Sequence, residues 1–197
     1  MKQLSTIALS ALVTTLFSCS YLTKKKYDLQ QNRTFKDPAE YLQEVRKKKL
    51  FGSDEIYYVD SAHFISFFNQ FVAKDSTIIY MGCSIDDSTW LKKSEQLLSN
   101  GSCKGRLDNE IERIVHLGQP GKEDVESGPS LQNQGLYRIS DNRPFERNHP
   151  KRMILLCYTY LFGNYYDATY RKIVQMATEA GIAIRVVVLD PVYRLFK

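Results

Sequence analysis

Segments with the pattern of β-strands alternate with segments with the pattern of amphipathic helices along most of this chain. Strands are expected at residues 55–59, 77–82, 152–160 and 182–189, which are rich in apolar and β-branched residues. Strands separated by helices are typical of parallel sheets that are covered on both faces. The sequence therefore predicts an α/β fold, a single three-layer domain over residues 37–197 with a mostly parallel sheet.

The helices are predicted from capping residues and from apolar side chains at helical spacing. Asp37-Pro38-Ala39-Glu40 has the pattern of a helix start, and Gly181 that of a helix end. The expected helices carry the following apolar residues: Tyr41, Leu42 and Val45; Phe64, Ile65, Phe67, Phe68, Phe71 and Val72 after a cap at Asp60-Ser61; Trp90, Leu91, Leu97 and Leu98 after a cap at Asp86, Asp87 or Ser88; Leu107, Ile111, Ile114 and Val115; and Tyr170, Ile173, Val174 and Ala177 within 167–180.

The segment from Gly118 to Pro150 is rich in glycine, proline, asparagine and charge, and only residues 136–139 resemble a strand. Loops this long are uncommon inside a domain and often functional or mobile. We expect the loop 118–150 to carry recognition, with Arg138, Arg143, Arg147 and His149 as donors, and residues 120–134 to lie outside the core. The alternative is an insertion without a role.

The N-terminus has the pattern of a secretory signal peptide over residues 1–18. A cation at Lys2 precedes an apolar run from Leu4 to Phe17, and Ser18-Cys19 follow. The run is shorter than the roughly 20 residues that a membrane-spanning helix needs. A lipoprotein signal, an ordinary cleaved signal and an uncleaved anchor are the three interpretations. Residues 19–36 are polar and include Lys24-Lys25-Lys26, which is typical of a flexible tether.

Ser18-Cys19 resembles the bacterial lipobox, although Phe17 stands where a small residue is usual, and the N-terminus is similar to that of Gram-negative, Bacteroidetes-like lipoproteins. The resemblance implies cleavage before Cys19 and a membrane anchor, such as palmitate, on that cysteine. Ser20 is compatible with sorting to the outer membrane. Since no acidic residue directly follows Cys19, the surface-export signal is not expected, and the domain should face the periplasm.

Composition restricts the partners. The net charge of +5 is small and spread along the chain, unlike the concentrated basic face of nucleic-acid-binding proteins. We therefore expect no nucleic acid, and instead a membrane, reached through the lipid on Cys19, and an unknown envelope protein or small ligand. No cofactor and no metal site is predicted, because His63, His116 and His149 lack ligand-spaced neighbours.

The cysteines are the candidates for chemistry. In open parallel sheets, sites gather where the strands end, which here means Asp60, Cys83, residues 161–164 and Asp190. If the protein is an enzyme, Cys83 and Cys103 are the candidate nucleophiles. They are also the expected disulfide pair, and Cys157, inside an apolar run, is expected to be a buried thiol.

Residues 152–191, a strand, a turn, a long helix and an apolar strand before Asp190-Pro191, resemble the central βαβ unit of thioredoxin-like proteins. The resemblance implies a thioredoxin-like fold. The family's C-x-x-C is replaced by Phe162 to Tyr165, which removes the redox pair. A non-catalytic binding or envelope-assembly lipoprotein is therefore expected. The alternatives are a thioredoxin-like thiol-dependent enzyme that uses Cys83 or Cys103, and a hydrolase whose residues lie in the loop 118–150.

Overall fold

The computed structural model describes residues 34–52, 55–72, 79–98, 103–146, 152–162 and 164–196. The predicted signal peptide, Cys19 and nearly all of the tether lie outside the described residues. Residues 35–159 and 167–197 form one compact unit, to which the following description refers, and Tyr160–Tyr166 belongs to a second unit together with residues 1–34.

The regular elements are α2 (Pro38–Lys47), β1 (Ile56–Val59), α3 (Phe64–Phe67), the π-helical η2 (Phe68–Val72), β2 (Tyr80–Ser84), β3 (Thr89–Leu91), α4 (Glu95–Leu98), α5 (Cys103–His116), η3 (Lys122–Asp124), β4 (Val125–Ser127), β5 (Leu136–Arg138), β6 (Met153–Tyr158), η4 (Tyr160–Phe162), α6 (Asp167–Glu179), β7 (Ala183–Val188) and η5 (Val192–Leu195). The four strands expected from the sequence are present as β1, β2, β6 and β7.

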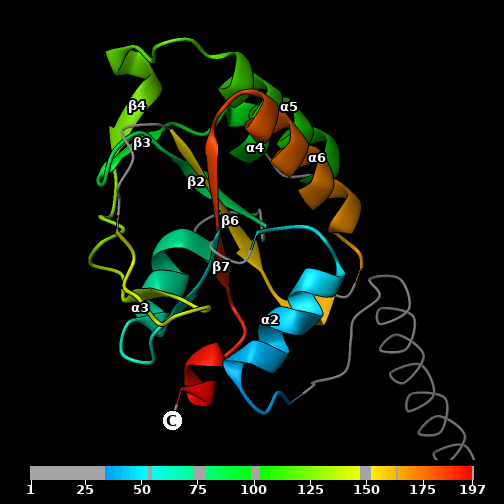
Figure 1. The fold of residues 1–197 in the computed structure, drawn as a ribbon. Helices are drawn as coiled ribbons and strands as arrows, with labels where there is room; N and C mark the ends of the chain where they lie inside the picture. Colours follow the sequence, from blue (N-terminus) through cyan, green and yellow to red (C-terminus); the bar gives the residue numbers. More distant parts are fainter. Residues whose placement is uncertain are drawn as a thin grey trace, which may run out of the picture. The chain divides into compact units, whose positions relative to one another are not determined.

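Within the described residues, the strands form one seven-stranded sheet in the order β4-β3-β2-β6-β7-β1-β5. Of these strands, Figure 1 labels β4, β3, β2, β6 and β7. Strands β6, β7 and β1 are parallel to one another. Strand β2 is antiparallel to β6, and β3, β4 and β5 are antiparallel to their neighbours. The α/β class is confirmed, whereas the prediction of a mostly parallel sheet is wrong. All five residues of β2 are buried, and this pattern does not distinguish the two directions.

The helix predicted after Asp86–Ser88 is also wrong at its start. Residues Thr89–Leu91 form strand β3, and a helix follows only at Glu95–Leu98. The carboxylate of Asp86 accepts hydrogen bonds from the backbone N–H of Ser88 at 3.0 Å and of Thr89 at 2.8 Å. Asp86 therefore stabilises the connection between β2 and β3 rather than a helix start, since aspartate side chains accept backbone N–H groups in both settings.

Helices α2 and α6 begin and end close to where the sequence predicts. The side chain of Asp37 caps α2 by accepting the N–H of Glu40 at 2.8 Å, with Pro38 in the first turn. Helix α6 connects the parallel strands β6 and β7 and ends before Gly181, whose φ of +65° suits a glycine. Helix α5 begins at Cys103, earlier than its apolar residues indicated, and packs beside α6 (Figure 1).

The segment 118–150 contributes to the core, so the expectation that residues 120–134 lie outside it is wrong. Leu131, fully buried, packs in one apolar cluster with residues of α3, η2 and of strands β1, β2, β6 and β7. Leu136 and Phe145 of the same segment belong to that cluster. The sequence did not indicate this role, because the segment is mostly polar and only a few of its apolar side chains pack in the core.

Asp87 fastens this segment to the β2–β3 turn. Its carboxylate accepts hydrogen bonds from the hydroxyl of Ser130 and from the N–H of Gln132, the latter at 3.2 Å. Trp90 of β3 donates its indole N–H to the carbonyl of Pro129 at 3.2 Å. A Cβ on Gly128 would lie 2.4 Å from the indole ring. The backbone can therefore pass this close to Trp90 only with glycine at position 128.

We predict that Leu131→Ala lowers the free energy of unfolding by about 3 kcal/mol, the usual cost of a fully buried leucine. Urea titration followed by circular dichroism measures the change. The control is Gln132→Ala at the exposed neighbour, which keeps its backbone bond to Asp87 and should shift stability by less than about 0.5 kcal/mol. Equal effects of the two substitutions would show that residue 131 lies outside the core.

Candidate functional site

Three parallel strands end side by side at the carboxyl edge of the sheet. In the register of β6, β7 and β1, Val188 lies between Tyr158 and Tyr58. Polar residues follow these strand ends: Thr159 directly after β6, Asp60 directly after β1, and Asp190 two residues after the end of β7. Ligands of open α/β sheets bind at such an edge. The structure thus places the predicted residues Asp60 and Asp190 at one edge.

The carboxylate of Asp190 is held by two hydroxyl donors. The Tyr41 hydroxyl donates to Oδ2 at 2.6 Å and the Thr159 hydroxyl to Oδ1 at 2.8 Å. Burial, and next the charge of Asp190, hold the pKa of Tyr41 well above its ordinary value, so this hydroxyl stays protonated and continues to donate. The arrangement joins α2 to the sheet edge. Neither donor was predicted, since Tyr41 falls in the apolar stripe of its helix.

Asp60 and His63 form a second polar pair at this edge. Asp60 Oδ1 accepts the backbone N–H of His63 at 2.9 Å and lies 2.8 Å from the ring Nδ1. A histidine bound to a carboxylate can act as a general base, but the same bonds also fix the start of α3. A Cβ on Gly135, where φ is +61°, would lie 2.5 Å from His63 Nδ1, so the pair requires glycine there.

Cys83 lies away from this edge. Because β2 runs antiparallel to β6, Ser84 pairs with Met153, the first residue of β6, and Cys83 pairs with Ile154. The direction of β2 thus moves Cys83 to the opposite edge from Asp190. The thiol is fully buried, and desolvation raises the pKa of Cys83 from 9.0 to about 12. A nucleophilic cysteine needs an accessible side chain and a lowered thiol pKa.

The other cysteine predictions have different outcomes. Cys157 is a free, buried thiol, as expected from its apolar run. Cys83 is also free. The predicted Cys83–Cys103 disulfide is therefore not formed in this structure. The side chain of Cys103 lies outside the described residues, so its reactivity stays a prediction.

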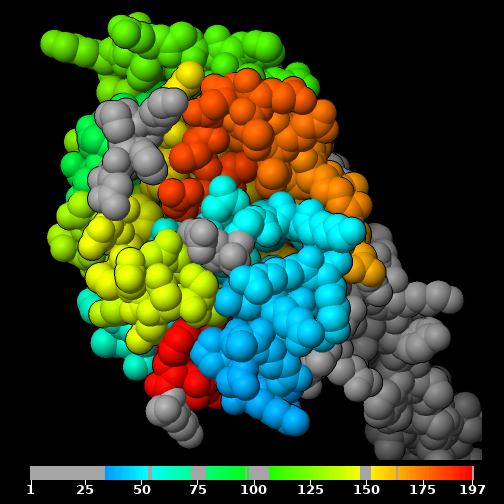
Figure 2. Space-filling view, in the orientation of Figure 1, coloured from blue at the N-terminus to red at the C-terminus, as the bar shows by residue number. Residues whose placement is uncertain are grey.

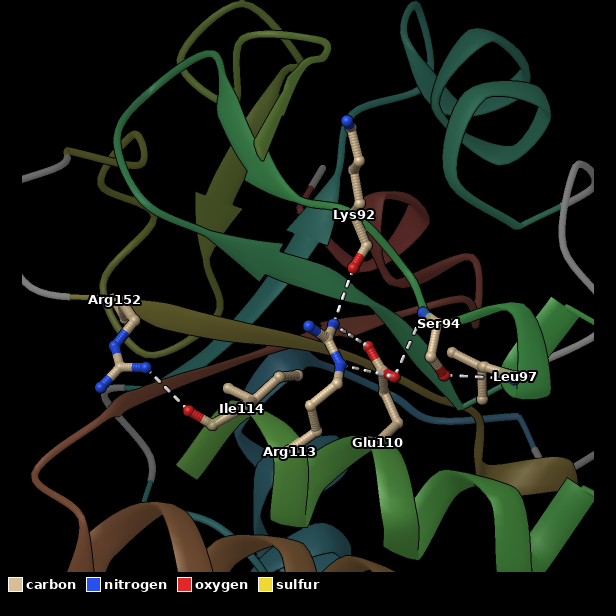
Figure 3. A network of polar contacts seen from close by, with 7 residues as sticks. All are labelled: Lys92, Ser94, Leu97, Glu110, Arg113, Ile114 and Arg152. Carbon is tan, nitrogen blue, oxygen red and sulfur yellow. Dashed lines mark hydrogen bonds and ion pairs between the residues drawn. The ribbon is translucent and has the colours of Figure 1, made fainter. Parts of the chain in front are cut away.

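An ion pair within α5 faces the backbone that follows β3 (Figure 3). The side chain of Glu110 is fully buried, and Arg113 donates to it at 2.7 and 3.3 Å and to the Lys92 carbonyl at 2.7 Å. The N–H of Ser94 also donates to Glu110 at 3.3 Å. Arg152 donates to two carbonyls at the end of α5, those of Ile114 and Leu117, both at 2.7 Å. These contacts fasten α5 to the sheet.

We predict that Arg113→Met lowers the free energy of unfolding by about 3 kcal/mol, because it leaves the buried Glu110 carboxylate without its cation. Chemical denaturation measures this. The matched control is Arg171→Met on α6, where the guanidinium is 60% exposed and 3.9 Å from Asp167, and where the expected loss is below about 0.5 kcal/mol. The double variant Glu110→Met, Arg113→Met should recover most of the loss, and a double variant as unstable as Arg113→Met would contradict this account.

Two tyrosines of the stretch 158–170 pack around one phenylalanine of the core. Tyr158 and Tyr170 contact the ring of Phe51 edge-on, at 5.8 and 5.2 Å between ring centroids. In the stretch 160–166, Tyr165 contacts Tyr166 at 4.7 Å. Tyr158 and Tyr170 therefore belong to the core.

The donors predicted in the segment 118–150 are partly paired. Asp141 accepts from Arg138 at 2.9 Å and lies 3.4 Å from Arg143. Arg147 and His149 lie outside the described residues. A pocket of about 420 Å³ lies beside the turn at residues 139–142. Its lining residues come from this turn, from α2 and its cap, and from Phe196. Arg46 is the cation on its wall.

No family model, no curated protein and no solved structure matches this chain. Within the described ranges, no helix is long and apolar enough to cross a membrane. In the same part of the chain, no three His, Cys, Asp or Glu side chains lie together as a metal site would require.

We predict that Cys83 resists alkylation in the folded protein. At pH 7.5 a pKa of about 12 leaves about a thousandfold less thiolate than the ordinary value of 9.0 does, and burial also blocks access. Maleimide labelling followed by peptide mass spectrometry measures the rate. The same chain in urea is the control and should label fast at Cys83. Rapid labelling in the native state would restore Cys83 as a candidate nucleophile.

Proposed function

We propose that this protein is a lipoprotein of the cell envelope, anchored through Cys19, with a non-catalytic α/β domain that binds a partner. The observation that carries the proposal is the N-terminal sequence, in which Lys2, the apolar run Leu4–Phe17 and Ser18-Cys19 stand in the order of a lipoprotein signal. An outer-membrane location facing the periplasm is part of the proposal and depends on Ser20 and on the absence of acidic residues directly after Cys19.

The polar contacts of the domain support a binding role over a catalytic one. At the carboxyl edge, Asp190 accepts hydrogen bonds from two hydroxyls, and Asp60 accepts the backbone N–H of His63 and lies 2.8 Å from the Nδ1 of its ring. These polar groups stabilise the positions of α2 and α3, so their role at this edge of the sheet is structural. In the thiol-dependent alternative, Cys83 is too deeply buried to react with a substrate. The reactive thiol of such an enzyme would therefore have to be Cys103.

The partner, an envelope protein or a small ligand, would contact the segment 118–150 in this proposal. The described part of that segment includes the exposed turn at Ser140–Asn142 and one wall of the pocket beside α2. We also propose that the domain has a three-layer, thioredoxin-like fold. The parallel unit β6–α6–β7 supports this proposal.

We predict that the mature chain begins at Cys19 and carries a diacylglyceryl group. Mass spectrometry of the N-terminal peptide from the membrane fraction checks this. Cys19→Ala should leave an uncleaved or soluble chain, because the acyl acceptor is lost, whereas the control Cys103→Ala should leave processing unchanged. A mature chain that begins at another residue would contradict the proposal.

A further inference from the structure

The helical segment formed by α3 and η2 has an uncharged outer side. Residues 61–72 include no Asp, Glu, Lys or Arg, although 25% of the whole chain is charged. Ile65 is 69% exposed and Phe68 is 38% exposed, so the prediction that both lie on the core-facing side of this helix is wrong. The two lie three positions apart and therefore on one side of the segment, while Phe67 and Phe71 pack in the core. Large apolar side chains exposed together indicate a contact surface.

The element η5 extends this surface with an aromatic ring and a cation. The ring of Tyr193 lies 6.0 Å from that of Phe64, and the guanidinium of the exposed Arg194 lies 5.8 Å from the Tyr193 ring. Tyrosine and arginine are common at the level of lipid headgroups, and a cation there is attracted by anionic lipids. We call Ile65, Phe68, Tyr193 and Arg194 the α3–η5 patch.

The start of the domain lies beside η5. Phe196, which follows η5, and Asp37, which caps α2, line the same pocket. Figure 2 shows the C-terminal residues, in red, next to α2, in blue. Residues 20–33 connect this point to Cys19 and reach at most about 50 Å. An anchor on Cys19 therefore restricts how far the end of the domain with the α3–η5 patch can move from the membrane.

We propose that the α3–η5 patch lies on the surface of the membrane in which the chain is anchored, with Ile65 and Phe68 at the level of the acyl-chain boundary and Arg194 among anionic headgroups. This rests on the proposed function, because the anchor on Cys19 supplies the membrane. The uncharged outer side of the segment and the flanking tyrosine and arginine favour a lipid surface as the occupant.

The test uses tryptophan fluorescence, since Trp90 is the chain's single tryptophan and is 6% exposed. The anchored full chain is reconstituted into vesicles of phosphatidylcholine and phosphatidylglycerol with brominated acyl chains, which quench nearby tryptophans. Phe68→Trp should be quenched at least threefold more than the unsubstituted chain. The matched control is Asn109→Trp on the exposed side of α5, which should behave like the unsubstituted chain. Adding Ile65→Asp should remove most of the quenching, whereas adding Asn109→Asp should not.

Equal quenching of Phe68→Trp and Asn109→Trp would overturn the proposal. So would a photo-crosslinker at position 65 that labels an envelope protein rather than lipid in cells. If Cys19 proves unmodified, the proposed function fails by itself. The same vesicle measurement then proceeds with the full chain held through an added N-terminal histidine tag on nickel-chelating lipid, and its result still decides whether the patch contacts the membrane.

Discussion

Strand β6 determines where the other elements of the sheet lie. All six of its residues are buried, and it has hydrogen-bonded neighbours on both edges, β7 in parallel and β2 antiparallel. Apolar burial on both faces, worth about 25 cal/mol per Å², holds such a strand in place. The direction of β7 then brings Asp190 next to Thr159, and the opposite direction of β2 takes Cys83 to the other edge.

The sequence pattern predicted this central part well. The strands β1, β6 and β7 and the helices α2 and α6 were identifiable because their apolar residues have clear spacing and their ends carry Asp37, Pro38 and Gly181. Strand direction was not predictable for β2, since a run of buried residues has the same pattern in either direction. Asp86 was ambiguous for a similar reason, because it fits a helix cap and a connection between strands equally.

The candidate site was less predictable than the fold. Asp60 and Asp190 could be found as polar residues at strand ends, but their partners come from elsewhere in the sequence. Tyr41 is 149 positions from Asp190, and no local pattern reveals such a contact. Glu110 and Arg113 did carry a signal, as opposite charges three positions apart beside the apolar residues Leu107, Ile111 and Ile114.

The segment that supplies Leu131 also supplies both edges of the described sheet, β4 on one side and β5 on the other. A flat sheet of this size would separate its outer strands by about 29 Å. The nine steps from Ser127 to Leu136 reach about 31 Å when fully extended, and a turn at Leu131–Gln134 shortens them. The sheet must therefore be strongly curled, with its two margins joined by one short piece of backbone. A displacement of either outer strand therefore pulls on the other through this connection, so the two margins should open together, as one cooperative unit.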